Sequence, residues 1–136
     1  MTRRETFSSS HKMWNSDWDE EKNRRVFGKC AGLHGHNYIL KVTVRGPVDV
    51  GTGMVIDIAI LKDAIKQHVL NDFDHKNLNE DVEEFIGTSG FPCTAENIAI
   101  VIFERLRNVL PEKILYKVEL FETENNSVVY FGEEEP

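Results

Sequence analysis

Cysteine is scarce in this sequence. Its 136 residues include only Cys30 and Cys93, and two cysteines cannot form the disulfide framework of a small secreted protein. We therefore expect two free thiols, a reducing compartment and a cytoplasmic protein. The sequence also lacks an apolar run near the roughly 20 residues that cross a bilayer, and its first residues lack the apolar segment of a secretory signal. We expect no membrane partner.

Positive charge is also in deficit. The chain has 16 Lys and Arg against 23 Asp and Glu, for a formal net charge of −7. Such a balance argues against nucleic acid and anionic membranes as partners. The N-terminal quarter is the exception, and its basic residues can serve a phosphate-bearing substrate. These residues are Arg3, Arg4, Lys12, Lys22, Arg24 and Arg25.

The apolar residues that are present alternate at both ends of the chain. Thr6, Phe7 and the serines fit a strand over residues 3–12. Alternation predicts a second strand over residues 36–46 and a hairpin over residues 115–132, with its turn at residues 124–127. Between them, residues 57–70 and 94–110 have the helical period, and Asp57 and Thr94 are the expected N-caps. Residues 71–93 are expected to be an irregular connection.

The resulting order is β-β-α-α-β-β. It predicts an α+β fold in which a four-stranded antiparallel sheet carries both helices on one face. We expect one domain over residues 1–136, ending in a short acidic tail. A sheet of this kind has two open edges, which neighbouring subunits often cover, so we also expect an oligomer.

Histidines are the first candidates for chemistry. His34 and His36 are two apart on an extended segment, so their side chains project to the same side. His11 ends the first strand, and pairing of that strand with the one near His36 brings it beside them. Three neutral histidines leave the fourth zinc position open, which is the catalytic arrangement. The alternative is that the pair is a surface or strand-end feature.

Cys30 has several possible roles. It is a fourth zinc ligand, a nucleophile or acid/base group, or a buried apolar residue. Its neighbours Gly28, Lys29 and Gly32 indicate a loop. Cys93 directly precedes the expected helix cap, which favours a structural role.

Three acidic or basic side chains complete the candidates. Asp74 and His75 are adjacent, and a carboxylate beside an imidazole holds its tautomer and raises its basicity. Glu122 lies on the apolar row of its predicted strand, where a carboxylate needs a partner such as a ligand with two parallel N–H donors. The alternatives are a solvated loop pair and a strand end that faces solvent.

Seven motifs, in order along nearly the whole chain, resemble the 6-pyruvoyl-tetrahydropterin synthase family. They are FSSSH, FGKC, HGHNY, TGMVID, DHKNLN, TAEN and LYKVELFETENN. The resemblance implies the tunnelling fold, in which three subunits close a twelve-stranded barrel and two such trimers form a homohexamer. It also implies active sites between subunits.

The resemblance assigns roles to individual residues. It implies zinc ligands at His11, His34 and His36, and proton-transfer groups at Cys30, Asp74 and His75, with Asp74 and His75 supplied by the neighbouring subunit. Glu122 would anchor the pterin ring, and Thr94 would help to hold it. Ala95 replaces a second threonine common in the animal enzymes.

The implied reaction converts 7,8-dihydroneopterin triphosphate to 6-pyruvoyl-tetrahydropterin and triphosphate, with Zn²⁺ as the cofactor. One departure is that only Ala-Gly-Leu separates Cys30 from His34. This short spacing is typical of the related 6-carboxy-tetrahydropterin synthase of queuosine biosynthesis, which releases acetaldehyde. That enzyme is the first alternative, and a non-catalytic pterin-binding oligomer is the second.

Overall fold

The computed structural model describes residues 1–87 and 91–133. The residues of the expected acidic tail from 134 onward lie outside this range. In chain order the elements are β1 (Thr2–His11), α1 (Glu20–Phe27), the 3-10 helix η1 (Gly28–Ala31), β2 (His34–Val44), α2 (Ile58–Ile65), the π-helical turn η2 (Lys66–Leu70), α3 (Asn71–Phe73), β3 (Lys76–Asn77), α4 (Leu78–Asp81), the 3-10 helix η3 (Glu83–Phe85), α5 (Ala95–Val109), β4 (Leu115–Thr123) and β5 (Asn126–Tyr130).

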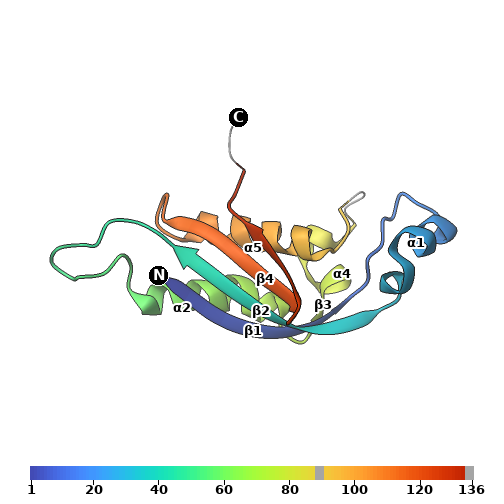
Figure 1. The fold of residues 1–136 in the computed structure, drawn as a ribbon, viewed down its shortest axis with the longest axis horizontal. Helices are drawn as coiled ribbons and strands as arrows, with labels where there is room; N and C mark the ends of the chain where they lie inside the picture. The colour runs from blue at the N-terminus through green and yellow to red at the C-terminus, as the bar shows by residue number, and fades with distance from the viewer. Residues whose placement is uncertain (88–90, 134–136) are drawn as a thin grey trace.

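The predicted α+β class is confirmed, but the predicted four-stranded antiparallel sheet is wrong in one respect. The sheet has five strands in the order β3-β1-β2-β4-β5, and β3 runs parallel to β1 (Figure 1). The extra strand forms because the chain leaving α3 returns along β1: the His75 N–H donates to the Ser8 carbonyl at 2.6 Å. The described part of the connection expected to be irregular thus contains α3, β3, α4 and η3.

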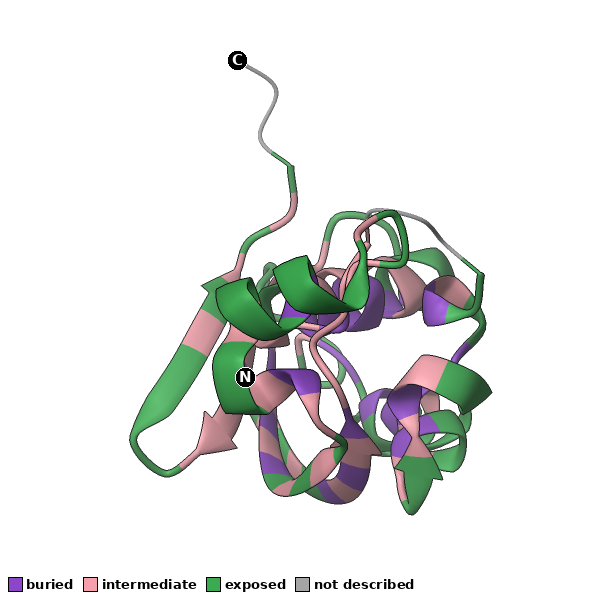
Figure 2. Ribbon diagram, turned by 90° about the vertical axis from the view of Figure 1, so that its right-hand side faces the viewer, coloured by how far each residue is buried: buried purple, intermediate pink, exposed green. Residues whose placement is uncertain are grey.

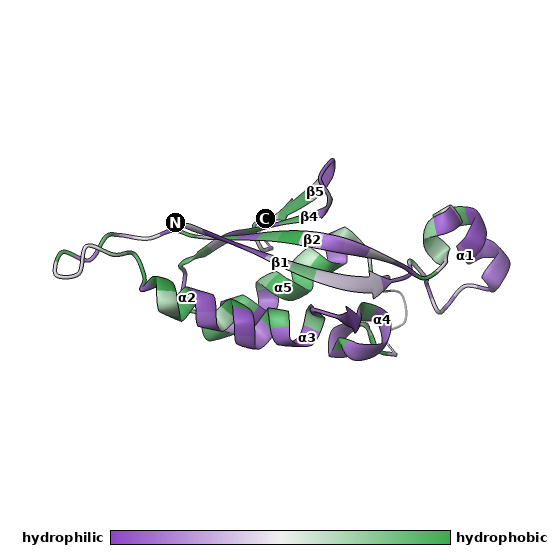
Figure 3. Cartoon of the chain, turned by 90° about the horizontal axis from the view of Figure 1, so that it is seen from below, coloured by the Kyte–Doolittle hydropathy of each residue, from purple (hydrophilic) through white to green (hydrophobic). Residues whose placement is uncertain are grey.

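The core lies between the sheet and the helices. Figure 3 shows α2, α3, α4 and α5 on the same side of the sheet, with α1 apart beyond the ends of β1 and β2. Alternate residues of β2 face that side, and Tyr38, Leu40 and Val42 are fully buried there. This alternation is visible as purple bands along the long strands in Figure 2. Burial of one strand face fixes the register and therefore the side on which each functional residue lies.

Both predicted helix caps are present. The Asp57 carboxylate accepts from the Ala59 N–H at 2.8 Å, and the Thr94 hydroxyl accepts from the Asn97 N–H at 3.2 Å. Helix α1 was not predicted, because its eight residues are almost all charged or polar. Over residues 1–87 and 91–133, no helix is long and apolar enough to cross a membrane.

Candidate functional site

The structure brings His11, His34 and His36 together at the end of the β1–β2 pair. His11 and His34 are direct cross-strand partners, and the ring centroids of His34 and His36 are 5.0 Å apart. One ring nitrogen from each histidine lies within 4.8 Å of the other two. The strand register therefore produces a cluster that can bind one ion through three side chains.

The hydrogen bonds of these rings select their tautomers. Nδ1 of His11 lies 2.7 Å from the Cys93 carbonyl oxygen, and Nδ1 of His34 lies 2.7 Å from the Gly32 carbonyl oxygen. A carbonyl only accepts, so each Nδ1 carries the proton and each Nε2 keeps a free lone pair. Such an outer hydrogen bond is typical of metal-binding histidines.

Burial leaves two of the free nitrogens without partners. Nε2 of His11 and Nε2 of His36 are buried and accept no hydrogen bond from the described residues. Burial lowers the pKa of His11 to about 4 and also lowers the pKa of His36, so both imidazoles are neutral at physiological pH. Neutral, converging and unpartnered nitrogens fit a divalent metal ion.

Glu122 faces this cluster from β4. Its Oε1 lies 3.6 Å from Nε2 of His36, and its Oε2 lies 3.9 Å from Nε2 of His11. The pairing of β4 with β5 shifts register between Phe121 and Thr123, and such irregularities re-aim side chains. The carboxylate is 24% exposed, so it points neither into the core nor fully into solvent.

A cavity of about 260 Å³ joins Glu122 to Thr94. Met13, Ala95 and residues at the start of β5 complete its walls. Its volume is below the roughly 300–1,000 Å³ of typical ligand pockets, but Glu122 and His36 also line a larger hollow of about 570 Å³. The two residues expected to hold a pterin ring thus line one space.

Cys30 is hydrogen-bonded to Met13, which lines the cavity at Thr94. It belongs to η1 and is half-buried, and its carbonyl oxygen accepts from the N–H of Met13 at 2.8 Å. Within the described part of the chain, the group of mutually close metal-binding side chains contains the three histidines and not Cys30. Cys30 and Glu122 both lie outside that group.

Asp74 and His75 lie elsewhere along β1. The Asp74 carboxylate accepts from the Ser8 N–H at 2.9 Å and lies 2.9 Å from Nδ1 of His75. The bond from Ser8 lowers the pKa of Asp74, so the carboxylate stays ionised. The imidazole of His75 is 81% exposed.

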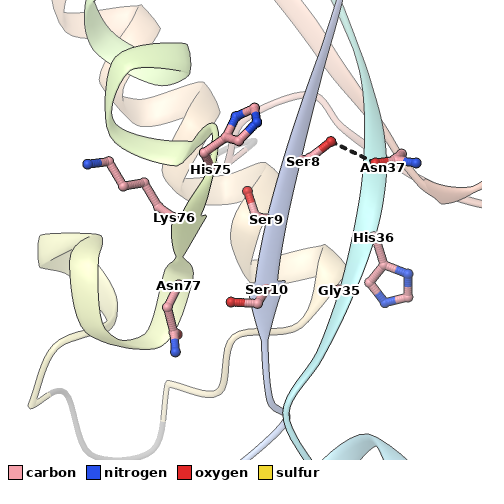
Figure 4. A pocket seen from close by; sticks show the side chains of 9 residues that line it. All are labelled: Ser8, Ser9, Ser10, Gly35, His36, Asn37, His75, Lys76 and Asn77. Atoms are coloured by element: carbon pink, nitrogen blue, oxygen red, sulfur yellow. Dashed lines mark hydrogen bonds between the residues drawn. The ribbon is translucent and has the colours of Figure 1, made fainter.

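His75 lines a cavity of about 490 Å³, which His36 also lines and which shares no lining residue with the cavity at Thr94. Figure 4 shows His75 on one side of β1 and His36 beyond its other side, on β2. The pair contacts β1 at Ser8, whereas Cys30 contacts the segment beyond the end of β1. Within one chain, the pair and the thiol therefore occupy different places.

Sequence reasoning missed two contributions. The Tyr38 hydroxyl is buried without a hydrogen-bond partner among the described residues, and burial together with the charge of Glu122 raises the pKa of Tyr38. The sequence pattern placed Tyr38 on the same strand face as His36 and therefore predicted only a core position for it. Burial raises the pKa of the Cys93 thiol to about 12, which agrees with a structural role for this side chain. The backbone carbonyl of Cys93, however, orients His11.

Comparisons with known proteins agree with this geometry. The family model described as 6-pyruvoyl tetrahydropterin synthase matches residues 1–133. A 6-pyruvoyl tetrahydrobiopterin synthase of Dictyostelium discoideum is 44% identical over 133 residues, which covers 98% of this chain and 96% of the relative. The solved structure of Caenorhabditis elegans 6-pyruvoyl tetrahydropterin synthase aligns with a TM-score of 0.89 at 42% identity, over 98% of this chain and 94% of that one.

A more distant relative bears on the product. A 6-carboxy-5,6,7,8-tetrahydropterin synthase of Rickettsia typhi is 30% identical, with 79% of this chain and 91% of the relative covered. The pyruvoyl enzyme above is thus both more similar and aligned over more of the chain. The chain belongs to the 6-pyruvoyl tetrahydropterin synthase family.

Proposed function

We propose that the protein is a zinc-dependent lyase that converts 7,8-dihydroneopterin triphosphate to 6-pyruvoyl-tetrahydropterin and triphosphate. The observation that carries this proposal is the convergence of three imidazoles beside Glu122, which also lines the cavity at Thr94. The similarity to pyruvoyl enzymes, at 44% identity over 98% of the chain, supports the same product.

Zinc would be held by His11, His34 and His36 through Nε2. When bound, zinc polarises substrate hydroxyls and acidifies the neighbouring C–H bonds as a Lewis acid. The carbonyls of Cys93 and Gly32 hold the first two rings in the required tautomer. Three neutral ligands leave a position for a substrate oxygen.

Glu122 and Thr94 would bind the pterin ring. A carboxylate accepts two parallel N–H bonds, which match the 2-amino group and the adjacent ring N–H of a pterin. The Thr94 hydroxyl already accepts from the Asn97 N–H, so its own O–H remains free to donate to a ring acceptor. Ala95 lines the same cavity but offers no hydroxyl.

Cys30 would remove and return the proton at the reacting carbon. Asp74 orients His75 through Nδ1, which leaves Nε2 of His75 to exchange a proton. The exposed imidazole lies away from Cys30 of its own chain, and a neighbouring subunit would bring the two together. The pair then polarises the partner's thiol.

Assembly into a barrel and a hexamer is part of the proposal. β3 pairs with β1 only at Ser9 and Ser10, so the described sheet leaves much of the outer edge of β1 available to another strand. β5 offers the opposite edge. Joining these edges in three copies of a single domain over residues 1–136 gives a closed barrel.

Mass spectrometry of the products tests the function. Zinc-loaded protein incubated with 7,8-dihydroneopterin triphosphate is expected to release triphosphate and 6-pyruvoyl-tetrahydropterin. Cys30→Ala is expected to retain zinc and lose turnover. Loss of zinc from this variant would make Cys30 a ligand and contradict its assigned role.

The second candidate is 6-carboxy-tetrahydropterin synthesis, favoured by the short spacing between Cys30 and His34. Formation of acetaldehyde and 6-carboxy-tetrahydropterin in the same experiment would establish it. Binding of the substrate without any product would instead support a pterin-binding oligomer.

A further inference from the structure

Glu122 has a position that ring binding alone does not explain. Its two oxygens lie 3.6 Å and 3.9 Å from Nε2 of His36 and of His11. The three histidine nitrogens lie within 4.8 Å of one another. Glu122 does not belong to that mutually close group, but its two oxygens approach two of the three nitrogens.

These distances approach those within a metal site. With metal–ligand bonds of about 2.0–2.2 Å and tetrahedral angles, neighbouring ligand atoms lie roughly 3.3–3.5 Å apart. Movements of a few tenths of an ångström bring the carboxylate to that spacing from His36 and His11. A partly exposed glutamate beside a strand irregularity has the freedom to make them.

The contact between Glu122 and Nε2 of His11 has no proton that could form a hydrogen bond between the two atoms. Nδ1 of His11 donates to the Cys93 carbonyl, so its Nε2 presents a lone pair. The Glu122 oxygen that faces it is a second acceptor. Two acceptors that face each other favour a cation between them, and the buried one, Nε2 of His11, has no hydrogen-bond partner among the described residues. The same cation would satisfy the unpartnered Nε2 of His36.

We propose that Glu122 is the fourth metal ligand of the substrate-free protein and leaves the metal to bind the pterin ring. This inference builds on the function proposed above and gives the ring-binding carboxylate a second role. Release of the carboxylate frees a metal position when the ring arrives. Ring recognition is thereby coupled to opening of the metal site.

The test compares Glu122→Gln and Glu122→Ala with Glu124→Gln, which removes one carboxylate from the exposed turn next to β4. Zinc affinity is measured by competition with a chelator, without substrate. Loss of an outer partner of a metal ligand costs about 10–100-fold in affinity, so loss of a ligand is expected to cost at least about 10-fold. Glu124→Gln is expected to match the wild type. Equal affinity in all four proteins would overturn the inference.

A second measurement uses pterin itself, which has no side-chain hydroxyls to bind the metal. Because coupling between two sites is reciprocal, saturating pterin is expected to weaken zinc binding by the wild type and to leave Glu122→Gln unchanged. Pterin that leaves the wild-type affinity unaltered would refute the ligand exchange. Neither measurement involves turnover, so this inference can fail while product formation succeeds, and the reverse.

Discussion

Arg105 offers the sharpest test of how the fold holds the Asp74–His75 pair. From α5, its guanidinium makes two hydrogen bonds of 2.6 Å to the carboxylate of Glu84 and one of 2.7 Å to Asp72. It also donates to the His68 carbonyl at 2.9 Å. One side chain thus joins α5, η2, α3 and η3. Of these elements, α3 ends directly before Asp74 in the sequence.

Arg105→Met keeps the aliphatic stem and removes these bonds. The Arg105 side chain is only 17% exposed, but Glu84 is 35% exposed and Asp72 is 53% exposed. Hydrogen bonds to charged groups contribute about 1.5–3 kcal/mol, whereas exposed ion pairs contribute about 1 kcal/mol or less. We assign about 2 kcal/mol to the Glu84 fork and about 1 kcal/mol to the remaining bonds together, so the expected loss is about 3 kcal/mol.

Urea unfolding of the metal-free protein measures this loss. Arg107→Met is the matched control, because Arg107 lies on the same helix, is 58% exposed and pairs only with Glu104 among the described ion pairs. Its expected effect is within about 0.5 kcal/mol. Turnover of Arg105→Met should also fall, because the segment that carries Asp74 and His75 loses its support. Zinc content should stay unchanged, because the three histidines lie on β1 and β2. A loss below about 1 kcal/mol would refute the assignment of Arg105 as the link between these helices.

Three further outcomes are expected. The bond from Arg105 lowers the pKa of Glu84 in the folded protein. The stability that this bond contributes is therefore present above pH 4.5 and is lost as the pH falls through the lower folded pKa. The difference in unfolding free energy between wild type and Arg105→Met should shrink in acid, and a constant difference in urea titrations down to pH 3 would contradict this. Tyr38→Phe removes a buried hydroxyl that has no partner among the described residues, so the melting temperature should stay equal or rise. A clear decrease would contradict this, because it would show that the hydroxyl makes a hydrogen bond. Cys30→Ser should retain zinc, measured by elemental analysis, while turnover falls at least about 100-fold, the lower range for loss of an acid–base group.

Much of the fold follows from short-range patterns. Residue types located β1, alternation located β2 and the terminal hairpin, and capping residues located α2 and α5, because each signal depends on a few neighbouring residues. The histidine cluster was predictable for the same reason: His11 ends one strand, His34 begins its partner, and antiparallel pairing places strand ends together. Helix α1 escaped because its polar residues carry no apolar period.

Other features depend on contacts that no local pattern encodes. β3 consists of two residues and exists only because the chain after α3 passes along β1. The pattern placed Tyr38 on the apolar face, but whether its hydroxyl finds a partner depends on residues distant in the sequence. The distance of Glu122 from the histidines depends on the irregularity at the end of β4. In the proposed assembly, the approach of Asp74 and His75 to a thiol depends on contacts between subunits, which no pattern within one chain encodes.

The most direct test of the account removes and restores the metal. Protein stripped by a chelator should neither release triphosphate from 7,8-dihydroneopterin triphosphate nor form a new pterin. Addition of about one zinc per chain should restore both, with 6-pyruvoyl-tetrahydropterin as the product identified by mass spectrometry. Equal turnover by stripped and zinc-loaded protein would show that the three histidines do not hold a catalytic metal, and would contradict the central claim.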